Sequence, residues 1–576
     1  MKLIKYMKPY WFFAIMTPLT MIGEVFIDLM LPTLMSKIVD DGVLGHNFEL
    51  IVRTGLIMLG LAFLGGLCGV GSSAFSGAAS HSFSRDLRND AFSKVMDLSF
   101  QQTDKFTTGS LVTRMTTDIN LIQQFVDLAL RMFVRSFMMS LGGIIMMLRL
   151  NVDFGIVLAI ALPIELIAML VIVGKSSPLF KTVQKKLDKV NSVVQENVSG
   201  ARVVKAYVRE KFETKRFSGA NDDLTETTLR VQKLMAILGP VLTIVLNVSV
   251  VAIIFIGGEK IESVASEMKV GSVMAAITYI TQILHAFTMV SMMSQSVTRA
   301  KASADRINEI LETEAVIKTG SVKIQSIDEI EFENVDFFYP GFEGKTVLNN
   351  LNLKIKKGEN IAILGATGSG KTSLVNLIPR FYDVSDGSLK INGIDVKELD
   401  LDSLRSRISI CMQKTELFSG TVNSNIRWGN ENAEQDEIVS ASDIAEAREF
   451  IEKMPDAYEG YVAEKGASLS GGQKQRLSIA RAILKKPDVL IFDDSTSALD
   501  LSTETKLRQK LFAKLKGTTV ITIAQRIASV KNCDRIVVID DGNLVAIGSH
   551  DELLETSEIY RDIYDSQMKK GDVLNA

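Results

Sequence analysis

Residues 361–373 read IAILGATGSGKTS. A short apolar run, typical of a buried strand, leads into a glycine-rich loop that ends in Gly370, Lys371 and Thr372. With Gly365 at its start, the loop has the full P-loop spacing. Its glycines let backbone N–H groups turn inward around phosphates, and the helix that follows points its N-terminus at them. The stretch therefore predicts an α/β domain that binds ATP or GTP.

Each part of the loop has a separate role in this prediction. Lys371 reaches the β- and γ-phosphates, and the Thr372 hydroxyl ligates Mg²⁺. Further along the chain, VLIFDD places Asp493 at the end of a buried strand, where P-loop enzymes hold the carboxylate on the Mg²⁺ side. The expected phosphate-binding residues are Gly365, Ala366, Thr367, Gly368, Ser369, Gly370, Lys371, Thr372 and Ser373.

The rest of the second half of the chain fits the same kind of domain. From about residue 327, short β-rich runs such as ISICMQ and RIVVID alternate with helical segments. Strands spaced by helices predict a mainly parallel α/β sheet. We expect the nucleotide-binding domain at 327–576, after a charged linker at 301–326.

The first half of the chain has a different composition. Overall, 47% of the residues are hydrophobic while 23% are charged, which suggests separate oily and soluble regions. A bilayer core needs about 20 apolar helical residues. Residues 1–300 are therefore expected to form an all-α membrane domain with two long polar excursions, at 80–128 and 175–233. The six expected spans are about 11–35, 54–79, 133–150, 152–174, 234–257 and 272–295.

The distribution of Lys and Arg predicts the orientation of these spans. Both excursions are rich in Lys and Arg, whereas the loops at 36–53 and 258–271 hold two each. The N-terminus, both excursions and the nucleotide-binding domain are therefore expected on the cytoplasmic side of the cell membrane. Membrane lipids are expected as neighbours. The net charge of −3 gives no indication of nucleic acid.

A second helix start is found in LSGGQKQRLSIARAIL, residues 469–484. A serine and two glycines open an amphipathic helix, which makes another anion-binding N-terminus. One P-loop domain has one phosphate site. The second start therefore suggests a nucleotide that is shared between two chains.

Taken together, GATGSGKT, LSGGQ and six spans resemble an ABC transporter of the exporter type, built as a half-transporter with fused membrane and nucleotide-binding domains. The resemblance implies ATP and Mg²⁺ as cofactors. It also implies that Gln413 is the Q-loop glutamine beside the metal, and that Tyr339 stacks on adenine, although a core or turn tyrosine is the alternative. The implied signature residues, which meet a partner's nucleotide, are Leu469, Ser470, Gly471, Gly472 and Gln473, and the implied D-loop residues are Ser497, Ala498, Leu499 and Asp500.

The two excursions also match the family. FTTGSLVTRMTTD, residues 106–118, and ENVSGARVVKAYVRE, residues 196–210, resemble the segments that carry the coupling helices. The resemblance implies that the second docks on the partner's nucleotide domain, with Ala206 and Tyr207 near its tip. Glu464 resembles the acidic residue of the loop that contacts the membrane domain.

Two positions depart from the family pattern. Asp494 stands where a glutamate polarises the attacking water, and Gln525 stands where a histidine contacts the γ-phosphate. Aspartate is one methylene shorter, and a general base needs to come within hydrogen-bond reach of its water. The sequence therefore predicts a site that binds ATP and hydrolyses it poorly. With its intact signature, the chain is expected to pair with a second, different half-transporter, and a slow homodimer is the alternative.

The sequence does not identify the transported compound. Glu24 and Asp28 lie in the first span on one helical face. Intramembrane acids usually face a cavity or a partner. The two acids therefore mark a cation-attracting substrate path, or they pair with a nearby cation or lie near the outer headgroups. We expect an ATP-driven exporter of hydrophobic or amphiphilic compounds working by alternating access. A lipid or peptide exporter and a nucleotide-gated channel or regulator are the alternatives.

Overall fold

A computed structural model of the chain describes residues 2–262, 268–341 and 344–574. The chain divides into two compact units. The first, here called the membrane unit, comprises Met1–Met96 and Thr108–Thr313. The second, the nucleotide unit, comprises Asp97–Thr107 and Glu314–Ala576. A short piece of the first excursion thus belongs with the nucleotide-binding fold.

The membrane unit is helical. Six of its helical segments are long and apolar enough to cross a membrane, as the sequence predicts. Its elements are η1 (Lys2–Tyr10), α1 (Trp11–Lys37), η2 (Ile38–Val43), α2 (Phe48–Asp97), α4 (Thr108–Thr113), η3 (Arg114–Asp118), α5 (Ile119–Leu128), η4 (Ala129–Phe133), α6 (Val134–Leu150), α7 (Asp153–Ser199), α8 (Ala201–Ala206), α9 (Glu210–Ala236), α10 (Leu238–Glu262) and α11 (Val270–Glu312). Because α11 continues to Glu312, the expected linker at 301–326 is helical over its first part.

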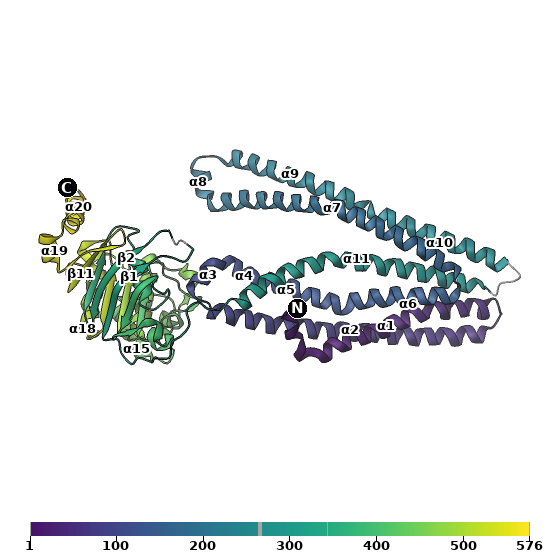
Figure 1. Cartoon of the computed structure of the whole chain (residues 1–576), viewed down its shortest axis with the longest axis horizontal. Helices are drawn as coiled ribbons and strands as arrows, with labels where there is room; N and C mark the ends of the chain where they lie inside the picture. Colours follow the sequence, from purple (N-terminus) through teal and green to yellow (C-terminus); the bar gives the residue numbers. More distant parts are fainter. Residues whose placement is uncertain (1, 263–267, 342–343, 575–576) are drawn as a thin grey trace. The chain divides into compact units, whose positions relative to one another are not determined.

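Two features organise this unit. Small residues let its helices approach closely: a side chain at Gly143 of α6 would collide with Ile283 of α11. The second excursion is a long helical hairpin, in which α7 and α9 run side by side with the short α8 at their tip (Figure 1). Ion pairs join the two arms, including Lys186 with Asp223 at 2.6 Å. The hairpin therefore holds α8 at its far end.

The nucleotide unit contains a six-stranded sheet in the order β12-β11-β3-β10-β9-β6, parallel except for the edge strand β12. A four-stranded antiparallel sheet has the order β2-β1-β4-β5, and β7 pairs with β8. The strands are β1 (Glu329–Phe337), β2 (Leu348–Lys356), β3 (Asn360–Leu364), β4 (Asp386–Ile391), β5 (Ile394–Asp395), β6 (Ile408–Cys411), β7 (Gly420–Thr421), β8 (Tyr461–Val462), β9 (Val489–Asp493), β10 (Thr519–Ile523), β11 (Arg535–Asp540) and β12 (Asn543–Gly548).

Helices pack around these sheets. They are α3 (Phe100–Phe106), α12 (Lys371–Leu377), η5 (Val396–Glu398), α13 (Leu401–Ser406), α14 (Val422–Arg427), α15 (Gln435–Ile444), α16 (Arg448–Glu452), η6 (Ala457–Glu459), η7 (Glu464–Gly466), α17 (Gly471–Leu484), α18 (Leu501–Lys514), η8 (Ile527–Ser529), α19 (His550–Thr556) and α20 (Glu558–Leu574). The apolar faces of α14, α15 and α17 pack into one core, which supports the start of α17.

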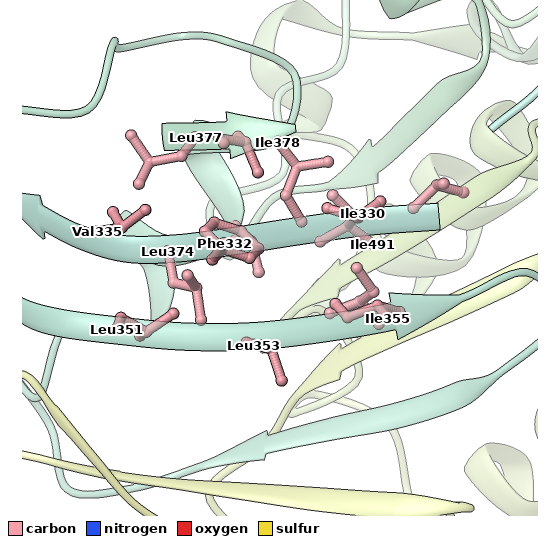
Figure 2. Packing of buried hydrophobic residues seen from close by; sticks show 14 of the residues in the cluster. Ile330, Phe332, Val335, Leu351, Leu353, Ile355, Leu374, Leu377, Ile378 and Ile491 are labelled. Atoms are coloured by element: carbon pink, nitrogen blue, oxygen red, sulfur yellow. The ribbon is translucent and has the colours of Figure 1, made fainter. Parts of the chain in front are cut away.

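The main core lies between the two sheets. Alternate residues of β1 and β2 are buried, including Phe332 and Leu353, as the two-residue period of a strand requires. Figure 2 shows them packed with Leu374 and Leu377 of α12 and with Ile491 of β9. This core fixes α12, and with it the loop that precedes its first turn.

Candidate nucleotide site

The candidate site lies at the carboxyl ends of four neighbouring strands of the six-stranded sheet. The P-loop follows β3, Gln525 follows β10, Asp493 ends β9 and Gln413 follows β6. Ligands of parallel α/β sheets bind at this edge. A cavity of about 570 Å³ opens there, and its lining includes Lys371, Thr372, Asp493, Asp494, Gln413 and Gln525. The structure therefore brings these predicted residues together.

The P-loop has the backbone that its glycines allow. Gly368 and Gly370 have φ of +87° and +99°, values that residues with a Cβ rarely adopt. At Gly370 a Cβ would also lie 2.7 Å from the Val347 carbonyl oxygen. Gly370 leads directly into α12, whose first residue is Lys371. The loop thus presents a helix N-terminus to the cavity.

Lys371 lies folded over the loop. Its Nζ donates to the carbonyl oxygens of Gly365 and Ala366 at 2.9 and 2.6 Å. Burial lowers the pKa of this ammonium group, and the negative charges of Asp493 and Asp494 oppose the shift. A buried cation beside a helix N-terminus is a strong attractor for phosphate.

Thr372 and Asp493 form the oxygen-rich side of the cavity. Thr372 Oγ1 donates to Asp493 Oδ1 at 2.9 Å, and Asp493 is 5% exposed. Burial raises the pKa of this carboxyl, while the Thr372 hydrogen bond lowers it. Mg²⁺ prefers oxygen ligands and is usually held by one or two protein oxygens together with phosphate. The hydroxyl and the carboxylate fit such an ion.

Asp494 has surroundings quite different from those of Asp493. It follows β9 in the left-handed region, with φ of +48°, a strained conformation that is common at functional sites. Gln525 Nε2 donates to its Oδ2 at 3.0 Å, and Gln413 Nε2 approaches the same oxygen at 3.5 Å. Two neutral amides therefore converge on the carboxylate that the sequence predicts at the position of the catalytic base.

Tyr339 lies in the wall of the same cavity. Its hydroxyl is 2.9 Å from Ser373 Oγ, and its ring packs edge-on against Phe337 and Tyr382. Stacking on adenine remains a prediction. Further lining residues that the sequence did not indicate are Lys345, Thr346, Asp541 and Gly542. Lys345 and Thr346 closely follow Tyr339 in the chain. Their basic and hydroxyl side chains, so near the predicted adenine-stacking residue, were the signal in the sequence that could have identified them as lining residues.

The signature residues start α17 and meet the D-loop of the same chain. Ser470 caps the helix, and its N–H donates to Gln473 Oε1 at 2.9 Å, which completes a capping box. A Cβ at Gly472 would lie 3.1 Å from the carbonyl oxygen of Ala498. Gln475, which the sequence did not indicate, accepts from the Ala498 N–H at 3.1 Å. Among the described residues, those lining the cavity include no member of Leu469–Gln473.

The predicted coupling residues are exposed. Tyr207 follows α8 at the tip of the hairpin and is 74% exposed, and Val203 of α8 is also exposed. Glu464 begins η7 on the surface of the nucleotide unit, just after β8. In that unit a groove of about 360 Å³ is lined by apolar and basic side chains, including Phe381, Met412, Phe418, Trp428 and Arg481.

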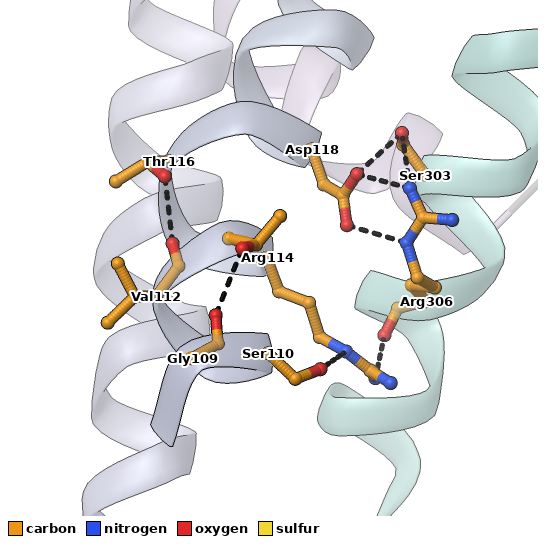
Figure 3. Close-up of polar contacts among 9 residues, drawn as sticks. Gly109, Ser110, Val112, Arg114, Thr116, Asp118, Ser303 and Arg306 are labelled. Carbon is orange, nitrogen blue, oxygen red and sulfur yellow. Dashed lines mark hydrogen bonds and ion pairs between the residues drawn. The ribbon is translucent and has the colours of Figure 1, made fainter. Parts of the chain in front are cut away.

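The first excursion contributes α3 to the nucleotide unit. α3 packs there: the Phe100 and Phe381 ring centroids lie 4.6 Å apart, and Tyr382 Oη donates to Asp104 at 2.8 Å. Burial and this hydrogen bond raise the pKa of Tyr382. The later part of the segment 106–118 packs on α11 through Arg114 and Asp118 (Figure 3), and its role in coupling stays a prediction.

Glu24 and Asp28 have a cationic neighbour. Arg135 of α6 pairs with Glu24 and also donates to Asp28 at 3.0 Å. Of the alternatives, pairing with a nearby cation is therefore present in the structure. A role in a substrate path remains a prediction.

Comparisons with known proteins agree with this geometry. Residues 14–287 match the ABC transporter transmembrane region, and residues 348–497 match the ABC transporter domain. An uncharacterized ABC transporter ATP-binding protein of Bacillus subtilis is 39% identical over 98% of both chains. The chain belongs to the ABC transporter family. An ATP-dependent lipid A-core flippase of Syntrophus aciditrophicus is 31% identical, over 94% of this chain and 90% of the flippase.

The ABC transporter fold is matched over nearly the whole chain. A bacterial Atm1-family ABC exporter with ATP bound has a TM-score of 0.80, at 23% identity, over 97% of this chain and 98% of that one. The predicted fold class, a six-helix membrane domain fused to an α/β nucleotide-binding domain, is confirmed. The protein is a multi-pass membrane protein of the ATP-hydrolysing ABC transporter family.

Proposed function

We propose that this ABC transporter chain is one half of a heterodimeric exporter of hydrophobic or amphiphilic compounds. Its own P-loop side, which includes Asp493 and Asp494, binds ATP with Mg²⁺ and hydrolyses it slowly. Its LSGGQ segment completes the faster site of a different partner chain. The observation that carries the proposal is the contact of Gln525 and Gln413 with the same oxygen of Asp494.

The chemistry of that contact favours slow hydrolysis. A general base needs to meet the proton it takes at about 2.6–3.2 Å. Aspartate ends about 1.5 Å short of glutamate, one carbon–carbon bond, and misplacement by about 1 Å costs about a hundredfold in rate. Here Asp494 Oδ2 is also occupied by the Gln525 amide at 3.0 Å, so the attacking water competes with that donor.

ATP binding does not depend on Asp494. Lys371 and the P-loop amides attract phosphate, while Thr372, Asp493 and the side-chain oxygen of Gln413 are the expected Mg²⁺ ligands. When bound, Mg²⁺ neutralises phosphate charge. The chain's own residues keep this phosphate-holding side complete even though the base position is altered.

The intact signature supports the shared site. Ser470 and Gln473 cap α17, so the N-terminus of this helix is ordered and has glycines at its first two positions. An anion-binding helix start that lies outside its own cavity suits a nucleotide held by another chain. We propose that a partner with glutamate and histidine at the two altered positions supplies that nucleotide.

The membrane and nucleotide units offer matching surfaces for coupling. The tip of α8 exposes Val203 and Tyr207, and the groove of the nucleotide unit exposes Phe418 and Trp428, whose rings stack at 4.2 Å. We propose that α8 docks into this groove on the partner, that Glu464 lies at the same interface, and that both nucleotide units are cytoplasmic.

ATPase measurements on the full chain in lipid nanodiscs that accommodate two copies test the proposal. The chain alone is expected to bind ATP and to show little vanadate-sensitive turnover. The double variant Asp494→Glu/Gln525→His is expected to raise kcat about a hundredfold. Each copy in a dimer of the variant then offers a complete P-loop side to the intact signature of the other copy. Asp540→Glu adds the same methylene at an exposed strand end and is expected to change nothing. A stable wild-type dimer that hydrolyses ATP as fast as the double variant would show that Asp494 is a sufficient base.

Lipid-like cargo is the second candidate, since two of the relatives are named ATP-dependent lipid A-core flippases. Lipid A-core stimulation of the ATPase activity would favour it. ATP-dependent conductance without substrate-dependent turnover would instead favour a nucleotide-gated channel.

A further inference from the structure

A cavity of about 390 Å³ lies inside the membrane unit, among elements that belong to the candidate membrane spans. Helices α1, α6 and α11 and the turn η4 supply its walls. The lining residues used below are Asp28, Met132, Arg135, Met139, Gln282 and Met289, and His285 also lines the cavity. Charged and amide side chains are expensive in a membrane domain and usually face a pathway or one another.

The charges at this cavity do not balance. Arg135 donates to Asp28 Oδ2 at 3.0 Å through one nitrogen and to Glu24 through another. One guanidinium therefore serves two carboxylates, and the three groups carry a net charge of −1. Within the part of the chain that the structure describes, Arg135 is the one donor that meets the Asp28 carboxylate. The second oxygen of Asp28 keeps its lone pairs for another donor.

In the described part of the membrane unit, several acceptor oxygens have no donor, and one of them, Gln282 Oε1, belongs to the cavity wall. Gln282 Oε1 and Glu24 Oε2 are buried without a hydrogen-bond partner among the described residues. Glu165 of α7 does not line the cavity and is 1% exposed: its Oε1 accepts from Thr288 of α11 at 2.7 Å, and its Oε2 has no donor among the described residues. A buried acceptor without a partner costs about 1–3 kcal/mol. Of these three, Gln282 Oε1 belongs to a cavity-lining residue. Arg131 Nε of η4 is a buried donor without a partner among the described residues, but Arg131 does not line the cavity, so the partner missing in the cavity wall itself is a hydrogen-bond donor.

The remaining wall is apolar and adaptable. Met132, Met139 and Met289 line it, and methionine fits irregular apolar groups because its side chain is flexible and polarizable. The cavity thus combines an acidic, acceptor-rich side with a thioether side. A ligand that matches both sides is an amphiphile with a positively charged, N–H-bearing head.

We propose that this cavity is a substrate subsite for amphiphilic organic amines in their protonated form. The ammonium group donates to Asp28 and to Gln282 Oε1, and the apolar body lies on the methionine wall. Neutral analogues lose the charge attraction, and anionic analogues meet the net negative charge and the unfilled acceptors. The proposal rests on the export function above and names the chemical class that is moved.

Binding of matched probes to the full chain in phosphatidylcholine nanodiscs, without ATP, tests this. The probes carry pyrene on one butyl chain that ends in an ammonium, a hydroxyl or a carboxylate group, and fluorescence anisotropy is corrected with empty discs. We expect the ammonium probe to bind at least about tenfold more tightly than the hydroxyl probe, since hydrogen bonds to charged groups contribute about 1.5–3 kcal/mol. The carboxylate probe is expected to bind most weakly. Equal binding of the ammonium and hydroxyl probes would overturn the proposal.

Three variants locate the subsite. Asp28→Asn is expected to reduce ammonium binding to the level of the hydroxyl probe. Gln282→Met, which keeps the length and removes the acceptor, weakens ammonium binding and leaves hydroxyl-probe binding within about twofold. The matched control is Asp153→Asn, since Asp153 is also ion-paired, with Lys260, in the membrane unit but does not line the cavity. Equal effects of Asp28→Asn and Asp153→Asn would overturn the assignment, and if Asp28→Asn does not fold, unchanged ammonium binding to Gln282→Met would do so.

Binding of a fluorescent ATP analogue is measured on the same discs. If the wild-type chain binds ATP but does not distinguish the ammonium probe from the hydroxyl probe, the subsite proposal is overturned and the exporter proposal is unaffected. Fast ATPase of the wild-type chain alone removes the heterodimer proposal and leaves probe selectivity to decide the subsite.

Discussion

Two clusters in the membrane unit each combine acidic side chains with an arginine. They differ in whether every carboxylate oxygen has a hydrogen-bond donor. Asp118 ends the π-helical turn η3 and is 1% exposed; Ser303 and Arg306 of α11 fill both of its oxygens, with Ser303 Oγ at 2.8 Å and Arg306 Nε at 2.7 Å (Figure 3). Asp28 lies beside the cavity near another π-helical turn, η4, and shares Arg135 with Glu24.

The difference separates a structural cluster from a candidate ligand site. A buried carboxylate with all of its hydrogen bonds made inside the chain stabilises the fold and has no capacity left for a ligand. A carboxylate that shares its cation with a second acid, beside acceptors without donors, retains that capacity. Stability measurements can test this distinction, because the two clusters respond differently when a polar group is removed.

The largest effect on stability is expected at the Asp118 cluster, called the closed cluster here because Ser303 and Arg306 fill both carboxylate oxygens. Arg306→Gln leaves Asp118 buried with Ser303 as its main donor, and removing one partner of a buried pair costs 3–5 kcal/mol. Because Arg306 is 46% exposed, we expect a loss at the low end, about 3 kcal/mol. The free energy of unfolding in mixed micelles, from denaturant titration, measures it.

Two further variants check that result. The double variant Asp118→Asn/Arg306→Gln is expected to lose less than Arg306→Gln alone, because no uncompensated charge remains buried. Arg216→Gln breaks an exposed pair with Glu196, and is expected to cost less than about 1 kcal/mol. If Arg306→Gln costs no more than Arg216→Gln, the closed cluster does not stabilise the membrane unit.

The sequence predicted the local features of the molecule well. The P-loop, the six spans and the serine that opens α17 depend on residues close together in the chain, where spacing alone determines the geometry. Asp494 and Gln525 were identified as altered positions. Their direct contact at 3.0 Å depends on the pairing of β9 with β10 and required the structure.

Contacts between distant segments were not predictable in the same way. Glu24 and Asp28 were placed on one helical face, but Arg135 lies 107 residues beyond Asp28, and only helix packing brings it there. Similarly, Arg114 was read as part of a coupling segment, and it contacts α11, 192 residues away. Ion pairing across a bundle has no periodic signature in the sequence.

A smaller effect on stability, of opposite sign, is expected at the cavity lined by Asp28, Arg135 and Gln282, called the open cluster here. Gln282→Met removes a buried acceptor without a partner, and such a group costs about 1–3 kcal/mol, so the variant is expected to gain about 1 kcal/mol of stability. Gln102→Met is the matched control. Gln102 accepts from the Ser99 N–H at 3.0 Å and donates to the Glu314 carbonyl, so this variant is expected to lose stability. A loss for both variants would show that Gln282 is as fully bonded as Gln102.

The smallest effect is expected for Asp28→Asn. Glu24 continues to pair with Arg135 in this variant, so the guanidinium keeps a carboxylate and the cluster changes from a net charge of −1 to neutral. We expect a change in the free energy of unfolding of less than about 1 kcal/mol, because the surviving pair still compensates the half-buried cation. A loss as large as that of Arg306→Gln would instead mean that Asp28 is as structural as Asp118. An acceptor without a donor would then not distinguish a ligand site from a structural ion pair in this membrane domain.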